Sequence, residues 1–175
     1  GMPAMRREIG VISHSSALYA DLTSMENLIF FGKMYGLEHP KESAQTALED
    51  VGLAPRRHDR VRTFSRGMLQ RLSIARSILH DPSILFLDEP FTGLDIHASN
   101  VLKEHLQTLH NKKRTILMTT HDVSCGLEMC DKVALQMMGR FAFFEDIKDI
   151  DKENFETLYF DEVRNNQFTM SIRPH

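Results

Sequence analysis

Apolar positions in the first half of the chain recur with the spacing of amphipathic helices. Between Pro40 and Gly52 they stand three and four residues apart, as on one face of a helix, and glycine is favourable just past a helix end. Thr23, followed three residues later by Glu26, matches a capping box and predicts the start of an earlier helix. Ser65 is a good N-cap for a third, longer helix. We therefore predict that this half is mainly helical.

Short apolar runs in the second half predict strands. The runs 84–87 and 115–119 are too short for helices, and they are typical of parallel strands that are buried on both faces. A helical stripe over 98–109 separates them, so strand and helix alternate as in an α/β sheet. The run 9–13 predicts one further strand, and apolar runs on either side of Gly139 predict a terminal hairpin.

The composition narrows the class of protein. The chain has 175 residues, of which 42% are hydrophobic and 26% charged, as in a soluble globular domain. Its formal charge of -3 provides no general attraction for nucleic acid, so we expect no nucleic-acid partner. No apolar run approaches the roughly 18 residues needed to cross a bilayer, and no leader pattern is seen, which favours the cytoplasm. Cys125 and Cys130 lack zinc-type spacing and are expected to be reduced thiols.

Two adjacent carboxylates, Asp88 and Glu89, come directly after the apolar run 84–87. Ligands bind at the carboxyl ends of parallel strands, and neighbouring acids are costly there unless a cation or a proton transfer uses them. We interpret Asp88 as a residue that holds Mg²⁺, directly or through water, and Glu89 as one that polarises an attacking water. A solvated strand end is the alternative, because acidic residues commonly occupy such positions.

Two other places have residues suited to a phosphate. Ser65 and Gly67 put a hydroxyl and bare N–H groups at the positive end of a helix dipole, which is typical of an anion site. The same residue types also start helices for purely structural reasons. His121 follows the run 115–119, where an imidazole could donate to a phosphate oxygen or orient water. An unremarkable surface histidine is the alternative.

These segments, taken in order, resemble the motifs of ABC-type ATPases. Residues 9–145 resemble that ATPase domain from just before its Q-loop to beyond its switch histidine, and His14 stands where the family usually has the Q-loop glutamine. The other motifs are the signature in 64–70, the Walker B strand in 84–90, the D-loop in 93–95 and the H-loop in 119–122. The resemblance implies a partial P-loop NTPase domain, α/β in class, with a helical subdomain, an incomplete and mainly parallel sheet, and a terminal β-hairpin. Its implied parts are the Q-loop strand and loop in 1–19, the helical subdomain in 20–81, the core α/β subdomain in 82–146 and a C-terminal tail in 147–175.

The resemblance also implies ATP and Mg²⁺ as cofactors and a role for each residue of the chain's own site. Asp88 would bind Mg²⁺, Glu89 would be the catalytic base, and His121 would contact the γ-phosphate. His14 would serve in place of the Q-loop glutamine, with shorter reach and a titration near neutral pH.

Further implied roles concern partners. Ser65 and Gly67 would touch the γ-phosphate bound to a second ABC ATPase subunit, and Asp95 would link the two sites. The helical subdomain would dock on a transmembrane permease subunit, which places the chain on the inner face of the cell membrane. The expected function is an ATP-binding subunit that couples ATP hydrolysis to transmembrane export.

Two departures from the family pattern qualify these expectations. Arg66 and Met68 replace a glycine and a glutamine of the common signature, a mild change. The P-loop motif G-x-x-x-x-G-K-[ST] does not occur; Gly32-Lys33-Met34 lacks both the preceding glycine and the hydroxyl. We therefore predict a chain truncated before its Q-loop, which alone binds ATP poorly, has negligible ATPase activity and self-associates through uncovered sheet.

The choice of transporter rests on finer resemblance. Residues 9–37 are similar to haem-exporter ATPases of cytochrome c maturation, while a basic residue before Gly-Met in the signature also occurs among drug and antibiotic exporters. A non-catalytic module that docks on a permease or pairs with a complete ATPase is the alternative function. A soluble ABC ATPase of DNA repair or translation is a third, which a coiled-coil insertion or a strongly basic face would favour; neither occurs.

Overall fold

The computed structural model describes residues 8–12, 17–111, 114–137, 139–151, 155 and 159. The chain divides into two compact units, Gly1–Thr120 and His121–His175. The first unit contains the predicted helices and the parallel sheet, and the second contains a short helix and the hairpin.

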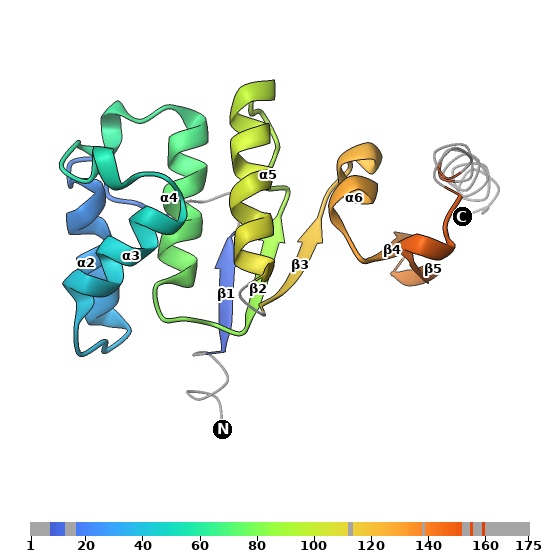
Figure 1. The fold of residues 1–175 in the computed structure, drawn as a ribbon, viewed down its shortest axis with the longest axis horizontal. Coiled ribbons are helices and arrows are strands. Elements are labelled where there is room, and N and C mark those ends of the chain that lie inside the picture. Colours follow the sequence, from blue (N-terminus) through green and yellow to red (C-terminus); the bar gives the residue numbers. More distant parts are fainter. Residues whose placement is uncertain are drawn as a thin grey trace, which may run out of the picture. The chain divides into compact units, whose positions relative to one another are not determined.

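The first unit contains a three-stranded parallel sheet with strand order β1-β2-β3 (Figure 1). Its strands are β1 (Ile9–Ile12), β2 (Ile84–Asp88) and β3 (Thr115–Thr119). The register aligns Val11 with Phe86 and Phe86 with Leu117. Because β2 lies between the other two strands, its carboxyl end has a neighbouring strand on each side.

In the described part of this unit four α-helices accompany the sheet, and their ends follow the local signals in the sequence. They are α2 (Ser24–Met34), α3 (Pro40–Asp50), α4 (Arg66–Ile78) and α5 (Ile96–Asn111). The capping box at Thr23 and Glu26 is confirmed, and its hydrogen bonds hold the pKa of the exposed Glu26 carboxyl below its ordinary value. Gly52, just past α3, has a φ of 64°, a conformation that costs glycine little.

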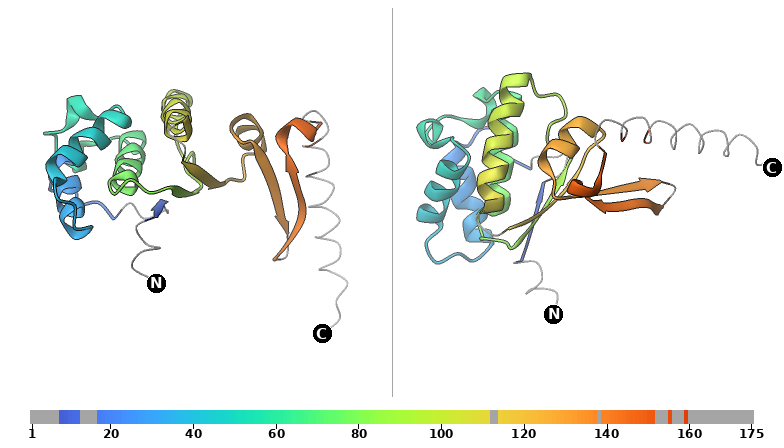
Figure 2. Two further views of the ribbon diagram at one scale, coloured as in Figure 1. Left: turned by 60° about the horizontal axis from the view of Figure 1, so that its bottom comes forward. Right: turned by 45° about the vertical axis from the view of Figure 1, so that its right-hand side comes forward.

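The expectation that the strands are covered on both faces is wrong for the described part of the chain. Figure 2 shows α4 and α5 on the same side of the sheet. On that side Leu85 and Leu87 are 0% and 1% exposed, respectively. The opposite row is open, since Val11 is 53%, Phe86 36% and Leu117 55% exposed. An apolar run indicates that a strand is hydrophobic. It does not indicate whether a second layer of structure covers both faces of that strand.

The second unit confirms the predicted hairpin. Its elements are α6 (Val123–Met129), β4 (Lys132–Met137), β5 (Arg140–Asp146) and a short 3₁₀ turn, η3 (Ile147–Asp149). The strands β4 and β5 are antiparallel, with an irregularity between Leu135 and Gln136. Cys125 and Cys130 are thiols rather than a disulfide, as expected. Among the described residues, no helix is both long and apolar enough to pass through a membrane.

Candidate functional site at the carboxyl end of the parallel sheet

Asp88 is the last residue of β2, and the neighbouring strand supplies its hydrogen-bond partner. The parallel register places Asp88 beside Thr119 at the end of β3. The Thr119 hydroxyl donates to Asp88 Oδ1 over 2.6 Å, and the carboxylate is exposed at the sheet edge. Carboxylate oxygens are the protein ligands that Mg²⁺ usually takes, and the Thr119 hydroxyl orients this one. The donor set therefore fits the predicted metal role of Asp88.

Glu89 leaves the strand in an unusual backbone conformation. Its φ is 50°, in the left-handed region that few residues other than glycine adopt, and such outliers gather at functional sites. The Glu89 N–H donates to the Thr119 carbonyl over 3.1 Å, which ties the turn to β3. The Thr92 hydroxyl donates to Glu89 Oε2 over 3.2 Å, and this orients the half-buried carboxylate. The two adjacent acids are thus held by hydroxyls from different segments.

The loop after Glu89 ends at Asp95, which starts α5. Asp95 Oδ1 accepts a hydrogen bond of 2.7 Å from the Ala98 N–H, and the Asp95 carbonyl accepts one of 2.9 Å from the Ser99 N–H. This is the geometry of an N-cap. Asp95 therefore has a structural function of its own, in addition to the linking role that we predict for it.

Replacing Asp95 by alanine should lower the free energy of unfolding by about 1 kcal/mol, because one N–H at the start of α5 loses its partner. Serine at the same position retains a capping oxygen and should restore most of that stability. Urea denaturation followed by circular dichroism measures both variants. Equal losses for alanine and serine would show that the cap contributes nothing.

The start of α4 packs against the same loop and against α5. Ser65 Oγ accepts a hydrogen bond of 3.3 Å from the Met68 N–H and so caps the helix. A Cβ on Gly67 would lie 2.9 Å from the Cβ of Ala98, and one on Gly93 would lie 2.3 Å from Cζ of Arg66. A side chain at Gly67 would therefore collide with α5, whereas one at Gly93 would displace the flexible Arg66 guanidinium and adopt a strained positive φ of 71°. These contacts bring the predicted signature and D-loop segments together within one unit.

The remaining predicted residues are placed differently. His14 lies outside the described residues. His121 is exposed and belongs to the second compact unit, two residues beyond β3 in the chain. Sequence reasoning missed Thr92 and Thr119, because a hydroxyl carries no signal of function until its partner across the sheet or turn is known.

This geometry is that of an α/β domain whose acidic residues stand at the carboxyl edge of a parallel sheet, where ligands bind. A family model described as "ABC transporter" matches residues 1–92, which is more than half of the chain. The chain therefore belongs to the ABC transporter family, and its relatives are named as ATP-binding proteins of that family.

Curated relatives and a solved structure agree with this assignment. The linearmycin resistance ATP-binding protein LnrL of Bacillus subtilis (strain 168) is 38% identical over 132 residues, covering 74% of this chain and 42% of that protein. NatA of the same organism, an ABC transporter ATP-binding protein, is 37% identical over 144 residues, covering 79% and 58%. The fluoroquinolones export ATP-binding protein MT2762 of Mycobacterium tuberculosis (strain CDC 1551 / Oshkosh) is 40% identical over 138 residues, covering 79% and 45%. The chain thus spans about half the length of these relatives.

The structural comparison extends the similarity to most of the fold. A solved ATP-binding subunit of an ABC transporter superposes with a TM-score of 0.75 and 28% sequence identity. The superposed region covers 92% of this chain and 70% of the chain of the solved structure. The predicted fold class, a partial P-loop NTPase domain with a mainly parallel sheet and a hairpin, is confirmed.

Proposed function

We propose that this chain is the part of an ABC transporter ATP-binding subunit that carries the Walker B acids, the signature and the D-loop, and that it couples ATP hydrolysis to export. The observation that carries the proposal is the pair Asp88 and Glu89 at the carboxyl end of β2, each fixed by a threonine hydroxyl. Nothing in folding requires two oriented carboxylates at a sheet edge, whereas ATP hydrolysis with Mg²⁺ requires both.

Each residue of the chain's own site has a proposed role. Asp88 would hold Mg²⁺ through its exposed carboxylate, and the metal ion, when bound, would neutralise phosphate charge. Glu89 accepts a hydrogen bond from the attacking water and polarises it, while Thr92 keeps the carboxylate turned toward that position. His121 donates to the γ-phosphate, and His14 takes the Q-loop position. The last two assignments rest on the resemblance alone.

The chain also presents residues to a partner subunit. Ser65 and Gly67, at the positive end of the α4 dipole, are suited to a γ-phosphate bound by a second ABC ATPase subunit. Asp95 lies on the adjoining loop and is proposed to link the two sites. The close packing of Gly67 on Ala98 supports the idea that these residues approach the partner as one surface. The helical subdomain is proposed to dock on a transmembrane permease subunit, which places the chain on the inner face of the cell membrane.

Export is the direction that the relatives favour. Their printed names refer to linearmycin resistance, fluoroquinolone export and Nod factor export. We therefore favour an exporter of the drug and antibiotic type for this chain. The similarity to haem exporters of cytochrome c maturation stays a prediction that none of these relatives tests.

The isolated chain should bind MgATP too weakly for its heat of binding to be measured by calorimetry. No G-x-x-x-x-G-K-[ST] loop occurs among its 175 residues to surround the phosphates with N–H groups and supply a lysine. A chimera in which the P-loop segment of NatA precedes residues 8–175 should bind MgATP and hydrolyse it. Clear binding by the isolated chain would contradict the prediction, and an inactive but folded chimera would contradict the proposed function.

A non-catalytic docking module is the second candidate function, because Ser65 at the start of α4 could complete the site of a partner without any hydrolysis by this chain. In that case this chain completes the site of a partner through Ser65 but hydrolyses nothing itself. Mixing the chain with a complete relative would then raise the ATPase rate of the mixture. The stimulation would be lost with Ser65→Ala and retained with Glu89→Gln, whereas the chimera would stay inactive.

Self-association is proposed for the isolated chain because one row of the sheet is apolar and open. The row consists of Val11, Phe86 and Leu117, each more than a third exposed. Sedimentation velocity at micromolar concentration should show dimers or larger species. Leu117→Glu should return the chain to monomer, and the matched change Met34→Glu, at a position that is 68% exposed on α2, should not. A monomeric parent chain would contradict this proposal.

A further inference from the structure

Two polar side chains near the start of α2 are completely buried. Ser24 and Asn27 are both 0% exposed. A buried amide or hydroxyl is costly unless its hydrogen bonds are made, so the partners of these side chains indicate what the burial achieves. The partners lie in two segments: the one that leads into α2, and one that follows α3 further along the chain.

Asn27 fastens the segment that leads into α2. Its Oδ1 accepts a hydrogen bond of 2.8 Å from the Tyr19 N–H. Its Nδ2 donates to the Tyr19 carbonyl and to the Thr23 carbonyl, both over 3.0 Å. One side chain thus satisfies both backbone groups of Tyr19 and closes the turn between Tyr19 and Thr23.

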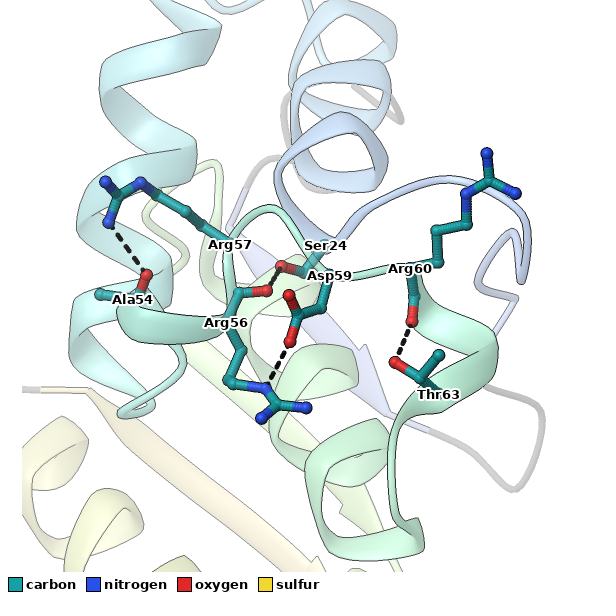
Figure 3. Close-up of polar contacts among 7 residues, drawn as sticks. All are labelled: Ser24, Ala54, Arg56, Arg57, Asp59, Arg60 and Thr63. Atoms are coloured by element: carbon teal, nitrogen blue, oxygen red, sulfur yellow. Dashed lines mark hydrogen bonds and ion pairs between the residues drawn. The ribbon is translucent and has the colours of Figure 1, made fainter.

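Ser24 fastens a second segment, more than thirty residues further along the chain. Its Oγ donates to the Arg56 carbonyl over 3.0 Å (Figure 3). Its N–H donates to the Asp59 carbonyl over 3.2 Å. The next N–H of the helix, that of Met25, donates to the Arg57 carbonyl over 3.1 Å. The free N–H groups at the start of α2 therefore bind the arginine-rich loop through its backbone.

The two segments are also joined directly by their backbones. The Val61 N–H donates to the Leu22 carbonyl over 3.0 Å, and the Arg62 N–H donates to the Ala20 carbonyl over 2.9 Å. Thr23 forms an antiparallel bridge with Arg60. We call the joined segments 19–25 and 56–62 the clasp.

The second segment of the clasp also makes contacts of its own and with the residue that follows it. Arg56 forms an ion pair of 2.6 Å with Asp59, and the Thr63 hydroxyl donates to the Arg60 carbonyl over 2.7 Å (Figure 3). Val61, which lies at the start of the 3₁₀ turn η2 (Val61–Thr63), is 3% exposed. The segment is therefore held from within as well as from α2.

The position of the clasp connects two parts of the proposed site. One half begins shortly after His14, and the other ends three residues before Ser65. Phe64 lies between the clasp and the signature serine; it is 8% exposed, and its N–H donates to the Val61 carbonyl over 3.0 Å. The backbone between the end of the clasp and the start of α4 is therefore held by burial and by a hydrogen bond.

We propose that Ser24 and Asn27 are positioning residues for Ser65. By holding the clasp together they fix where α4 begins, and they make the segment that follows the Q-loop position move together with the entry to the signature helix. This inference rests on the proposed function in one respect, namely that Ser65 is the residue whose position matters. The clasp itself is a property of the chain and needs no nucleotide.

The test is amide hydrogen exchange by NMR on the full chain without nucleotide. Asn27→Ala and Ser24→Ala should each speed exchange about tenfold at Val61, Arg62 and Met68, whose N–H groups bond within the clasp or to Ser65 Oγ. Ser24→Thr keeps the hydroxyl and should restore slow exchange. Exchange in the second half of α4 should change much less.

Leu28→Ala is the matched control, because Leu28 is equally buried on the same helix but makes no hydrogen bond of the clasp. It should speed exchange across α2 and α3 without singling out residues 61–68. The inference is overturned if Asn27→Ala and Ser24→Ala leave residues 61–68 at the parent rate, or if Leu28→Ala produces the same pattern. Since no ATP is present, failure of the chimera to hydrolyse ATP would leave this result untouched, and failure here would leave the proposed function standing.

Discussion

Glu89→Gln should lower the ATPase rate of the P-loop chimera by about 100- to 10,000-fold, the range that a general base contributes. Glutamine has nearly the same shape, and it can still accept the hydrogen bond from the Thr92 hydroxyl. It has no negative charge with which to polarise water. The fold should therefore survive while the rate falls, and steady-state phosphate release measures that fall.

The control for this experiment is Glu104→Gln, which removes an acid of the same kind from an exposed position on α5. Its rate should equal that of the parent chimera. Nucleotide affinity should change little in Glu89→Gln, because the substitution removes an interaction made mainly in the transition state. A rate within tenfold of the parent would show that Glu89 is not the catalytic base.

Leu72→Ala should lower the free energy of unfolding of the chain by about 2–5 kcal/mol. Leu72 is 0% exposed on α4, the helix that packs against β1 and has Ser65 as its N-cap. Truncation removes buried apolar surface and leaves a cavity that its neighbours fill only in part. Domains are stable by only about 5–15 kcal/mol, so this loss is a large part of the total free energy of unfolding. Urea denaturation followed by circular dichroism measures it.

Met34→Ala provides the comparison, because Met34 is 68% exposed near the end of α2. That change should alter the free energy of unfolding by less than about 0.5 kcal/mol. If Leu72→Ala cost no more than Met34→Ala, α4 would not be packed as described. The position of Ser65 would then lose its structural basis.

The elements of this protein were predictable where the signal is local. The capping box at Thr23 and Glu26, the proline that opens α3 and the glycine beyond its end act within one or two turns. Their effects hardly depend on the rest of the chain, so the sequence shows them directly. The acids Asp88 and Glu89 were predictable for the same reason, because their place at a strand end follows from the apolar run before them.

Several features of the site could not be predicted in this way. Thr119 lies thirty-one residues from Asp88, and only the parallel register of β2 and β3 joins their side chains. Thr92 is closer in sequence, but its hydrogen bond to Glu89 depends on the positive φ of Glu89. No residue type in the segment indicates that conformation. The apolar runs predicted cover on both faces, whereas the family resemblance predicted uncovered sheet. Only the structure shows that the row of Val11, Phe86 and Leu117 is open, because hydrophobicity does not reveal which layer is present to cover a strand.

The sequence by itself determined the family, the order of the motifs and the residues that carry charge at the sheet edge. The tertiary structure alone decided which hydroxyls orient those acids, how the signature packs against the D-loop, and how the clasp joins Ala20 to Arg62. The physical reason lies in the kind of interaction. Caps and periodic apolar faces depend on side chains a few residues apart, whereas strand register and backbone hydrogen bonds between distant segments use groups that every residue possesses, so only packing selects among them.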